Sequence, residues 1–207
     1  LDILANGYIF LIAGYETTSI TLQFIAYVLA RYPEIQDRLY EEVTGILGDK
    51  DVVEYDDIMQ MHYMEQVMCE TLRMYPPVVR TERDCGTDTV VDGVPIEKGT
   101  SVHVAVYAIH HNEEYYPNPE KFDPNRFSSA EKALRDPLAF IPFGYGPRNC
   151  IGMRFALIQI RFTMARLIRK YKFILPDEMK DKPLELDTSM MTKPVKPIMI
   201  KMEKRDV

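Results

Sequence analysis

Residues 143–152 read Phe143-Gly144-Tyr145-Gly146-Pro147-Arg148-Asn149-Cys150-Ile151-Gly152. The segment sets one cysteine between a glycine-containing loop and a long apolar helical pattern. Glycine permits positive φ and a close approach of the backbone to a flat ligand, and Pro147 limits the freedom of the loop. The unpaired amides in the first turn of a helix stabilise an anionic sulfur. The segment therefore predicts that Cys150 is presented to a metal as a thiolate.

Two neighbours of this cysteine suit a bound cofactor. Gly152 would let the helix backbone pass close under a cofactor, and Arg148 is a fixed cation within reach of a cofactor carboxylate. The alternative for Cys150 is a buried structural cysteine, which is the commonest fate of a free thiol.

Composition limits the class of protein. The chain has 207 residues, of which 46% are hydrophobic, so it can bury a core, and its formal net charge of −6 argues against a general nucleic-acid binder. Its three cysteines, Cys69, Cys85 and Cys150, form no Cys-x-x-Cys pair and indicate reduced thiols in a compartment facing the cytosol. Because Leu1 lies inside an apolar helical pattern, we interpret residues 1–207 as one partial domain truncated at its amino end.

The hydrophobic pattern predicts a mainly α-helical chain with small β-sheets. A helix from Leu1 to Tyr32, buried on most sides, should end before Pro33, and its polar interruptions argue against a membrane span. Residues 112–147, rich in proline, should form an ordered meander rather than a helix. The other expected elements are helices at 34–47, 62–75 and 150–170, a short helical turn that starts at Asp56 and Asp57, and strands at 89–91, 94–96, 101–107, 184–186 and 197–202.

A second chemical cluster, Ala13-Gly14-Tyr15-Glu16-Thr17-Thr18, interrupts the first apolar helix. A buried threonine hydroxyl can bond to the carbonyl four residues earlier, which bends the helix and makes room for water. The alternative is that these threonines make that local bond and nothing more.

A third cluster is Glu70-Thr71-Leu72-Arg73, in which Glu70 and Arg73 share one helix face. Such pairs are common on solvated helices, but apolar neighbours surround this one, and Arg126 offers a second arginine in the meander. Arg80 and Arg83 lie three residues apart in an extended segment, so at most one can face a ligand. The alternative for Arg83 is a solvent-facing side chain paired with Glu82 or Asp84.

Together these motifs resemble those of the cytochrome P-450 superfamily. The matching patterns are Phe-x-x-Gly-x-Arg-x-Cys-x-Gly at 143–152, Ala-Gly-x-Glu-Thr-Thr at 13–18 and Glu-x-x-Arg at 70–73. The resemblance covers essentially the whole chain, which corresponds to the C-terminal half of the family's sequences. The residues of the motifs at 13–18 and 143–156 are most similar to those of the animal microsomal drug- and steroid-oxidising branch. It implies the cytochrome P-450 fold from the oxygen-activating helix through the haem-cysteine helix to the terminal strands.

The resemblance also implies roles for individual residues. Cys150 would be the axial thiolate of haem b, Thr17 and Glu16 would organise proton delivery, and Arg83 would face a haem propionate. Other haem contacts would come from Arg148, Phe143, Gly144, Ala13, Gly152 and Ala156. Glu70, Arg73 and Arg126 would form the triad that ties the meander to the core, and Ala13, Val78 and Val79 would line the substrate pocket.

The function implied by the resemblance is a haem monooxygenase. It would insert one oxygen atom of O₂ into a small apolar substrate, with electrons from NADPH through a cytochrome reductase, at the cytosolic face of the endoplasmic reticulum membrane. Its membrane contact would be an N-terminal anchor missing from this chain. Two alternatives are a haem-thiolate isomerase acting on a peroxide, against which the Glu16–Thr17 pair argues, and an inert haem-binding fragment, against which the intact motifs argue.

The remaining signals concern the last long helix and the histidines. Residues 151–175 hold six cations and no acid, so one face could receive an acidic electron donor, or the cations could simply favour the helix C-terminus. We expect packing or surface roles for His103, His110 and His111, and a core role for the helix stripe Ile151, Phe155, Ile158 and Phe162. The six cations are Arg154, Arg161, Arg166, Arg169, Lys170 and Lys172.

Overall fold

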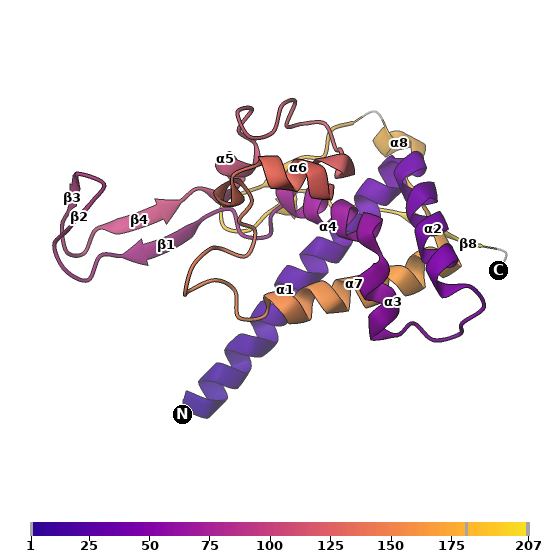
Figure 1. Ribbon diagram of the computed structural model, residues 1–207, viewed down its shortest axis with the longest axis horizontal. Coiled ribbons are helices and arrows are strands. Elements are labelled where there is room, and N and C mark those ends of the chain that lie inside the picture. Colours follow the sequence, from indigo (N-terminus) through magenta and orange to yellow (C-terminus); the bar gives the residue numbers. More distant parts are fainter. Residues whose placement is uncertain (1, 181, 206–207) are drawn as a thin grey trace.

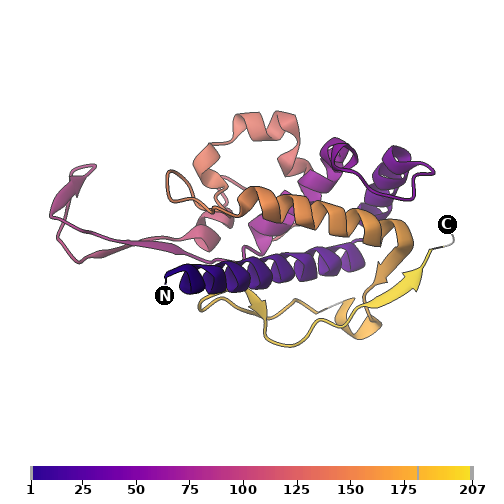
Figure 2. The same cartoon turned by 90° about the horizontal axis from the view of Figure 1, so that it is seen from below.

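The computed structural model describes residues 2–180 and 182–205, and in this part of the chain it is mainly helical with small two-stranded antiparallel sheets (Figure 1). Two long helices, α1 (Asp2–Arg31) and α7 (Met153–Lys170), lie against each other along the middle of the molecule (Figure 2). Helices α2 (Pro33–Leu47), α3 (Tyr55–Gln60) and α4 (His62–Met74) pack around them. The mainly helical class predicted from the sequence is confirmed.

Local chemistry sets the boundary between α1 and α2. Pro33 is the first residue of α2, where its missing amide costs no hydrogen bond and its fixed φ suits a helix. Gly48 ends α2 with φ +49° while its amide donates to the Thr44 carbonyl. The predicted ends near residues 32 and 48 are therefore correct, although Leu1 lies outside the described residues.

The apolar face of α1 is buried over only part of its length. From Thr18 onward the helix contributes Ile25, Val28 and Leu29 to the main core, whereas its first fourteen described residues are exposed. The expectation of a helix buried on most sides is thus wrong for the amino-terminal half, because no other described segment covers it. By length and composition alone α1 could cross a membrane, but soluble core helices pass the same test.

A ribbon built from β1 (Thr81–Asp84) and β4 (Ser101–Val104) projects from the helices (Figure 1). Its tip is the predicted hairpin of β2 (Thr89–Val91) and β3 (Val94–Ile96), which is confirmed. Asp92 and Gly93 both have positive φ, as a tight two-residue hairpin turn requires. The strand expected to reach Tyr107 ends at Val104, because α5 (Val106–His110) follows with a helical bond from the His111 amide to the Tyr107 carbonyl.

The meander between α5 and α7 is ordered, as predicted, but it includes short helical turns. These are η1 (Pro124–Phe127), α6 (Ser129–Leu134) and η2 (Pro137–Ala139). Side chains of Asp123, Ser128 and Asp136 each accept a hydrogen bond from an amide of the turn that follows. Asx and serine caps thus stabilise turns that the proline count had argued against.

The chain ends in short paired strands. β5 (Tyr171–Ile174) follows α7 directly and pairs with β8 (Lys201–Lys204), while β6 (Leu186–Asp187) pairs with β7 (Lys193–Pro194). Helix α8 (Asp177–Lys180) lies between β5 and β6. Terminal strands were expected, but β5 and α8 were not, and the last strand begins at Lys201 rather than at Pro197.

Candidate functional site

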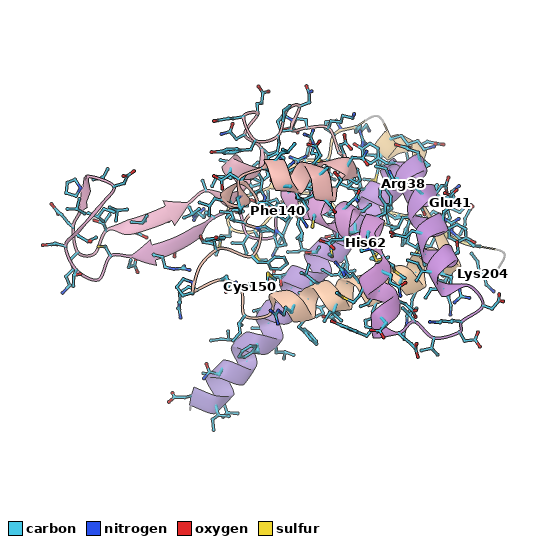
Figure 3. The ribbon with its side chains drawn as sticks, in the orientation of Figure 1. Arg38, Glu41, His62, Phe140, Cys150 and Lys204 are labelled. Carbon is cyan, nitrogen blue, oxygen red and sulfur yellow. The ribbon has the colours of Figure 1, made fainter. Side chains whose placement is uncertain are left out.

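Cys150 is exposed in the loop immediately before α7, where that helix crosses α1 (Figure 3). The Cys150 amide donates to the Phe143 carbonyl at 2.8 Å, which closes the loop that the sequence predicted. Gly144 and Gly146 have φ of +72° and +80°, so both positions need glycine. The helix begins at Met153 rather than at Cys150, because residues 150–152 form a turn whose bond joins the Met153 amide to the Cys150 carbonyl.

Gly152 lies directly beside the sulfur. A methyl group added at this residue would be 4.0 Å from Cys150 Sγ and close to no other described atom outside its own backbone neighbourhood. The contact distance is an ordinary one, so Gly152 leaves open space next to the thiol. A planar ligand bound to the sulfur can use this space.

Apolar side chains that belong to no core surround the cysteine. Ile151 is 85% exposed and Phe155 is 71% exposed, so the prediction that these two residues are helix core is wrong. Ile158 and Phe162 do pack against the main cluster. Neighbouring exposed apolar side chains often mark a binding site. Together with a thiolate donor and the small Ala13 and Gly14 on exposed α1, it fits an apolar, planar metal cofactor such as haem.

Arg83 extends from β1 to the cysteine loop. Its Nη2 donates to the Arg148 carbonyl at 3.3 Å, and its Nη1 donates to the Glu82 carbonyl at 2.6 Å. Arg80 instead donates to the Ser189 carbonyl on the C-terminal segment, so the two arginines bond to different parts of the chain. Arg83 is therefore the arginine next to the loop that carries Cys150.

The polar run of α1 contains both local and distant bonds. Thr17 Oγ1 donates to the Ala13 carbonyl at 2.7 Å, which is the local bond considered as the alternative. The neighbouring Glu16 carboxylate accepts from Lys193 Nζ of β7 at 2.5 Å, and both side chains are about half exposed. The sequence pattern did not predict the contact of Lys193 with Glu16, because 177 positions separate the two residues.

Lys193 is held in place by the residue before it. The buried Thr192 donates its hydroxyl to the Pro76 carbonyl and its amide to the Pro77 carbonyl. Val78 forms an isolated bridge with Met191, and Val79 is buried. The segment after Pro77 thus meets the C-terminal strands beside the middle of α1.

Glu70, Arg73 and Arg126 meet where α4 packs against the meander at η1. Arg73 Nε and Nη2 donate to the two carboxylate oxygens of Glu70 at 2.7 and 2.9 Å, with both side chains fully buried. Arg126 Nε lies 3.5 Å from Glu70 Oε1, and the Asp123 amide donates to the same oxygen at 2.9 Å. This carboxylate therefore connects α4 to the meander at η1.

The pKa of the Glu70 carboxyl is raised in this site. Burial raises the pKa of the carboxyl, while the hydrogen bonds from Arg73 and the Asp123 amide and the charge of Arg126 act to lower it. Arg73 also donates to the carbonyls of His110 and Pro119, so its buried guanidinium has neutral acceptors as well as the charged partner. Such full satisfaction is what a buried ion pair needs in order to persist.

The predicted basic face of α7 is smaller than the sequence suggested. Arg161 is buried and its Nη2 pairs with Glu65 of α4 at 2.9 Å, and Arg169 donates to the carbonyls of Gly48 and Lys50. These two arginines hold helices together and are not available to a partner. Arg154, Arg166 and Lys170 are exposed, and among these Arg154 is four residues from Cys150.

The other sulfurs and the histidines differ from Cys150. Burial raises the pKa of the Cys69 thiol to about 12, so this sulfur is not a ready anion, and Cys85 donates to the Thr87 carbonyl. His103 is exposed, with Nδ1 3.7 Å from Glu82, whereas His110 is fully buried and His111 stacks on Tyr107. His110 makes contacts that the sequence did not predict.

Comparison with known proteins identifies a family and several relatives of this chain. The family model described as cytochrome P450 matches residues 1–202. Cytochrome P450 3A2 of Rattus norvegicus is 44% identical over 206 residues, and cytochrome P450 3A5 of Homo sapiens is 43% identical over 206 residues. Each alignment covers 100% of this chain and 41% of the relative. Cytochrome P450 3A19 of Capra hircus aegagrus is 42% identical over 99% of this chain and 94% of that relative. These relatives confirm the predicted likeness to the animal branch.

Proposed function

This chain belongs to the cytochrome P450 family, and from that premise we propose that the complete polypeptide is a haem-dependent monooxygenase that inserts one oxygen atom of O₂ into an apolar organic substrate. The chain spans about two fifths of the length of the rat and human relatives, so this proposal concerns the longer protein. The observation that carries it is the exposed Cys150 on a closed glycine loop among uncovered apolar side chains.

The residues around the sulfur would hold haem b. Cys150 would supply a thiolate ligand, with Phe143, Gly144, Gly152 and Ala156 near it in the chain and Ala13 on α1. Arg83, whose guanidinium reaches the Arg148 carbonyl, would neutralise a propionate together with Arg148 itself. Haem supplies the redox chemistry of dioxygen when it is bound, and the protein supplies orientation and proton access.

Proton access is the proposed task of Glu16 and Thr17. The Thr17 hydroxyl is both donor and acceptor and is held at the Ala13 carbonyl, so it can pass a proton at the face of α1. The Glu16 carboxylate, held by Lys193, is the nearest ionisable group in sequence and can exchange protons with water because it is half exposed. Substrate would approach along Ala13, Val78 and Val79, which are apolar.

A direct test measures oxidation by the complete protein with NADPH and its reductase. The probe is a fluorogenic benzyl ether, which releases a fluorescent phenol when the benzylic carbon is hydroxylated. Product is expected only when NADPH, reductase and O₂ are all present. Conversion of an organic hydroperoxide without NADPH, and no product from the ether, would favour the isomerase and contradict the monooxygenase.

We also propose that electrons arrive from NADPH through a flavoprotein reductase that docks beside Arg154, at the cytosolic face of the endoplasmic reticulum membrane. Arg154 is exposed within one turn of the cysteine loop, and an acidic partner surface would be steered toward it. Arg166 is exposed on the same helix but about 120° further around it, so it serves as a matched control.

The docking proposal predicts that Arg154→Gln lowers the rate of haem reduction about 3- to 10-fold at low ionic strength and weakens its dependence on salt. Arg166→Gln is expected to leave both quantities near the values of the unaltered protein. Stopped-flow reduction over a range of salt concentrations measures them. Equal rates and equal salt dependence for Arg154→Gln and the unaltered protein would rule out docking at this face.

A further inference from the structure

His110, the last residue of α5, connects the buried ion pair of α4 to the segment that leads into the cysteine loop. Its main-chain carbonyl accepts a hydrogen bond from Arg73 Nη1 at 3.0 Å. Its ring Nε2 accepts one from the Ile141 amide at 3.0 Å. The ring also stacks on Phe140, which lies in the same segment (Figure 3), with ring centroids 5.4 Å apart.

The ring can act only as an acceptor toward Ile141. An imidazole nitrogen that accepts a hydrogen bond is unprotonated, so the proton of the neutral ring is on Nδ1. Burial lowers the pKa of His110 to about 3, and the nearby His111 and Arg73 add to the effect. Nδ1 is buried and has no hydrogen-bond partner within residues 2–180 and 182–205. The Ile141 amide is therefore the hydrogen-bond partner of normal geometry for this ring, while the main chain of Leu72 and Arg73 near the ring acts to raise its pKa.

Two short steps join Ile141 to the sulfur ligand. The Ile141 carbonyl accepts from the Gly144 amide at 3.0 Å, and the Phe143 carbonyl accepts from the Cys150 amide at 2.8 Å. Residues 141–143 are thus held at one end by His110 and hold Cys150 at the other. A shift of Ile141 would move the carbonyl that fixes the Cys150 main chain.

The other anchor of this segment lies further from the cysteine. The Tyr116 hydroxyl donates to the Ala139 carbonyl at 3.0 Å, two residues before Ile141. Among the described side chains, His110 is the one that bonds the main chain between Ala139 and the start of the closed loop at Phe143. Its position, rather than its burial alone, sets it apart from ordinary core residues.

We propose that His110 is a positioning residue for the Cys150 thiolate: by accepting the Ile141 amide while its own carbonyl is held by Arg73, it fixes the direction in which the sulfur meets the haem iron. This inference rests on the proposed ligation of haem by Cys150. His110 itself would contact neither the sulfur nor the metal. It transmits the rigidity of the Glu70–Arg73 pair to the loop through two hydrogen bonds.

The test compares three variants of the complete, haem-loaded protein. His110→Gln keeps an acceptor at about the reach of Nε2, His110→Asn is polar but one atom too short, and His110→Leu removes the acceptor. The Asn and Leu variants should bind haem about 3- to 10-fold more weakly, which is less than the roughly 10- to 100-fold effect of losing a direct partner of a metal ligand, because His110 acts through Ile141 and Phe143. Their iron–sulfur stretching band in resonance Raman spectra should shift and broaden, while Gln should keep the band of the unaltered protein.

His111→Leu is the matched control, because within the described residues the His111 ring bonds to the Tyr107 carbonyl of the helix that it caps, and its loss should leave the iron–sulfur band unchanged. The inference is overturned if Asn and Leu keep both the band and the haem affinity, or if Gln is as defective as Asn. Where Leu does not fold, the comparison of Gln with Asn decides. An unaltered protein without any iron–sulfur band would instead contradict ligation by Cys150, whatever the variants do.

Discussion

Replacement of Cys150 by histidine is expected to abolish the strongly red-shifted Soret band of the reduced, CO-bound protein and to leave the band of a histidine-ligated haem. The thiolate donates more electron density to the iron than a neutral imidazole does, so the band reports the identity of the ligand. Cys150 is the exposed cysteine of the three and lies on the closed loop, so no other described sulfur can replace it. Absorption spectroscopy on the complete protein measures the change.

Cys85→Ser is the matched control for this substitution. Cys85 is half-buried at the outer end of the ribbon, where β1 leads to the tip hairpin, and it donates to the Thr87 carbonyl, a bond that a serine hydroxyl can also make. This variant should keep the thiolate band at full intensity. An unaltered spectrum in the Cys150→His protein would remove the basis of the proposed oxygenase function.

Features that depend on neighbours in sequence could be predicted. The cysteine loop requires glycine at 144 and 146 because of their positive φ, and the pairing of Glu70 with Arg73 follows from helical spacing. The hairpin at Asp92-Gly93 follows from turn chemistry. In each case the interacting residues lie within ten positions of one another. A local sequence pattern therefore contains both partners of the contact.

Features that depend on distant partners could not be predicted from local patterns, and the contact of Arg126 with Glu70 was expected from the family resemblance alone. β5 pairs with β8 some thirty residues later, and Lys193 reaches Glu16 across 177 positions. His110 was expected to pack or to lie at the surface; it does pack, but its role depends on an amide 31 positions away. Nothing in the local sequence around His110 identifies that amide as its partner.

Hydrophobic patterns predicted which side chains need cover but not what covers them. Ile151 and Phe155 share a helix stripe with Ile158 and Phe162, yet only the last two meet the described core. The exposed amino-terminal half of α1 is a similar case. Hydrophobic periodicity shows that one face of a helix tends to be buried away from water. A cofactor or another protein segment can bury that face just as residues of this chain can.

Glu70→Gln is expected to abolish stable haem incorporation. The carboxylate accepts from two nitrogens of Arg73 and from the Asp123 amide, and it lies next to Arg126. Without its charge, a fully buried guanidinium and a nearly buried one lose their counter-ion, which costs about 3–5 kcal/mol. Because domains are stable by only about 5–15 kcal/mol, the meander and the His110 contact should loosen together. Haem-to-protein ratio and the free energy of unfolding measure the effect.

The control is Glu65→Gln on the same helix. Glu65 also faces two cations, Lys132 and Arg161, but its side chain is 36% exposed, so water can replace much of what the carboxylate provides. A loss of about 1–2 kcal/mol is expected there, because the buried Arg161 also loses a partner, together with normal haem content. If Glu70→Gln kept as much haem and as large a free energy of unfolding as Glu65→Gln, the buried triad would not support the cysteine loop. Removing the one carboxylate of the triad would then have left the sulfur equally well placed.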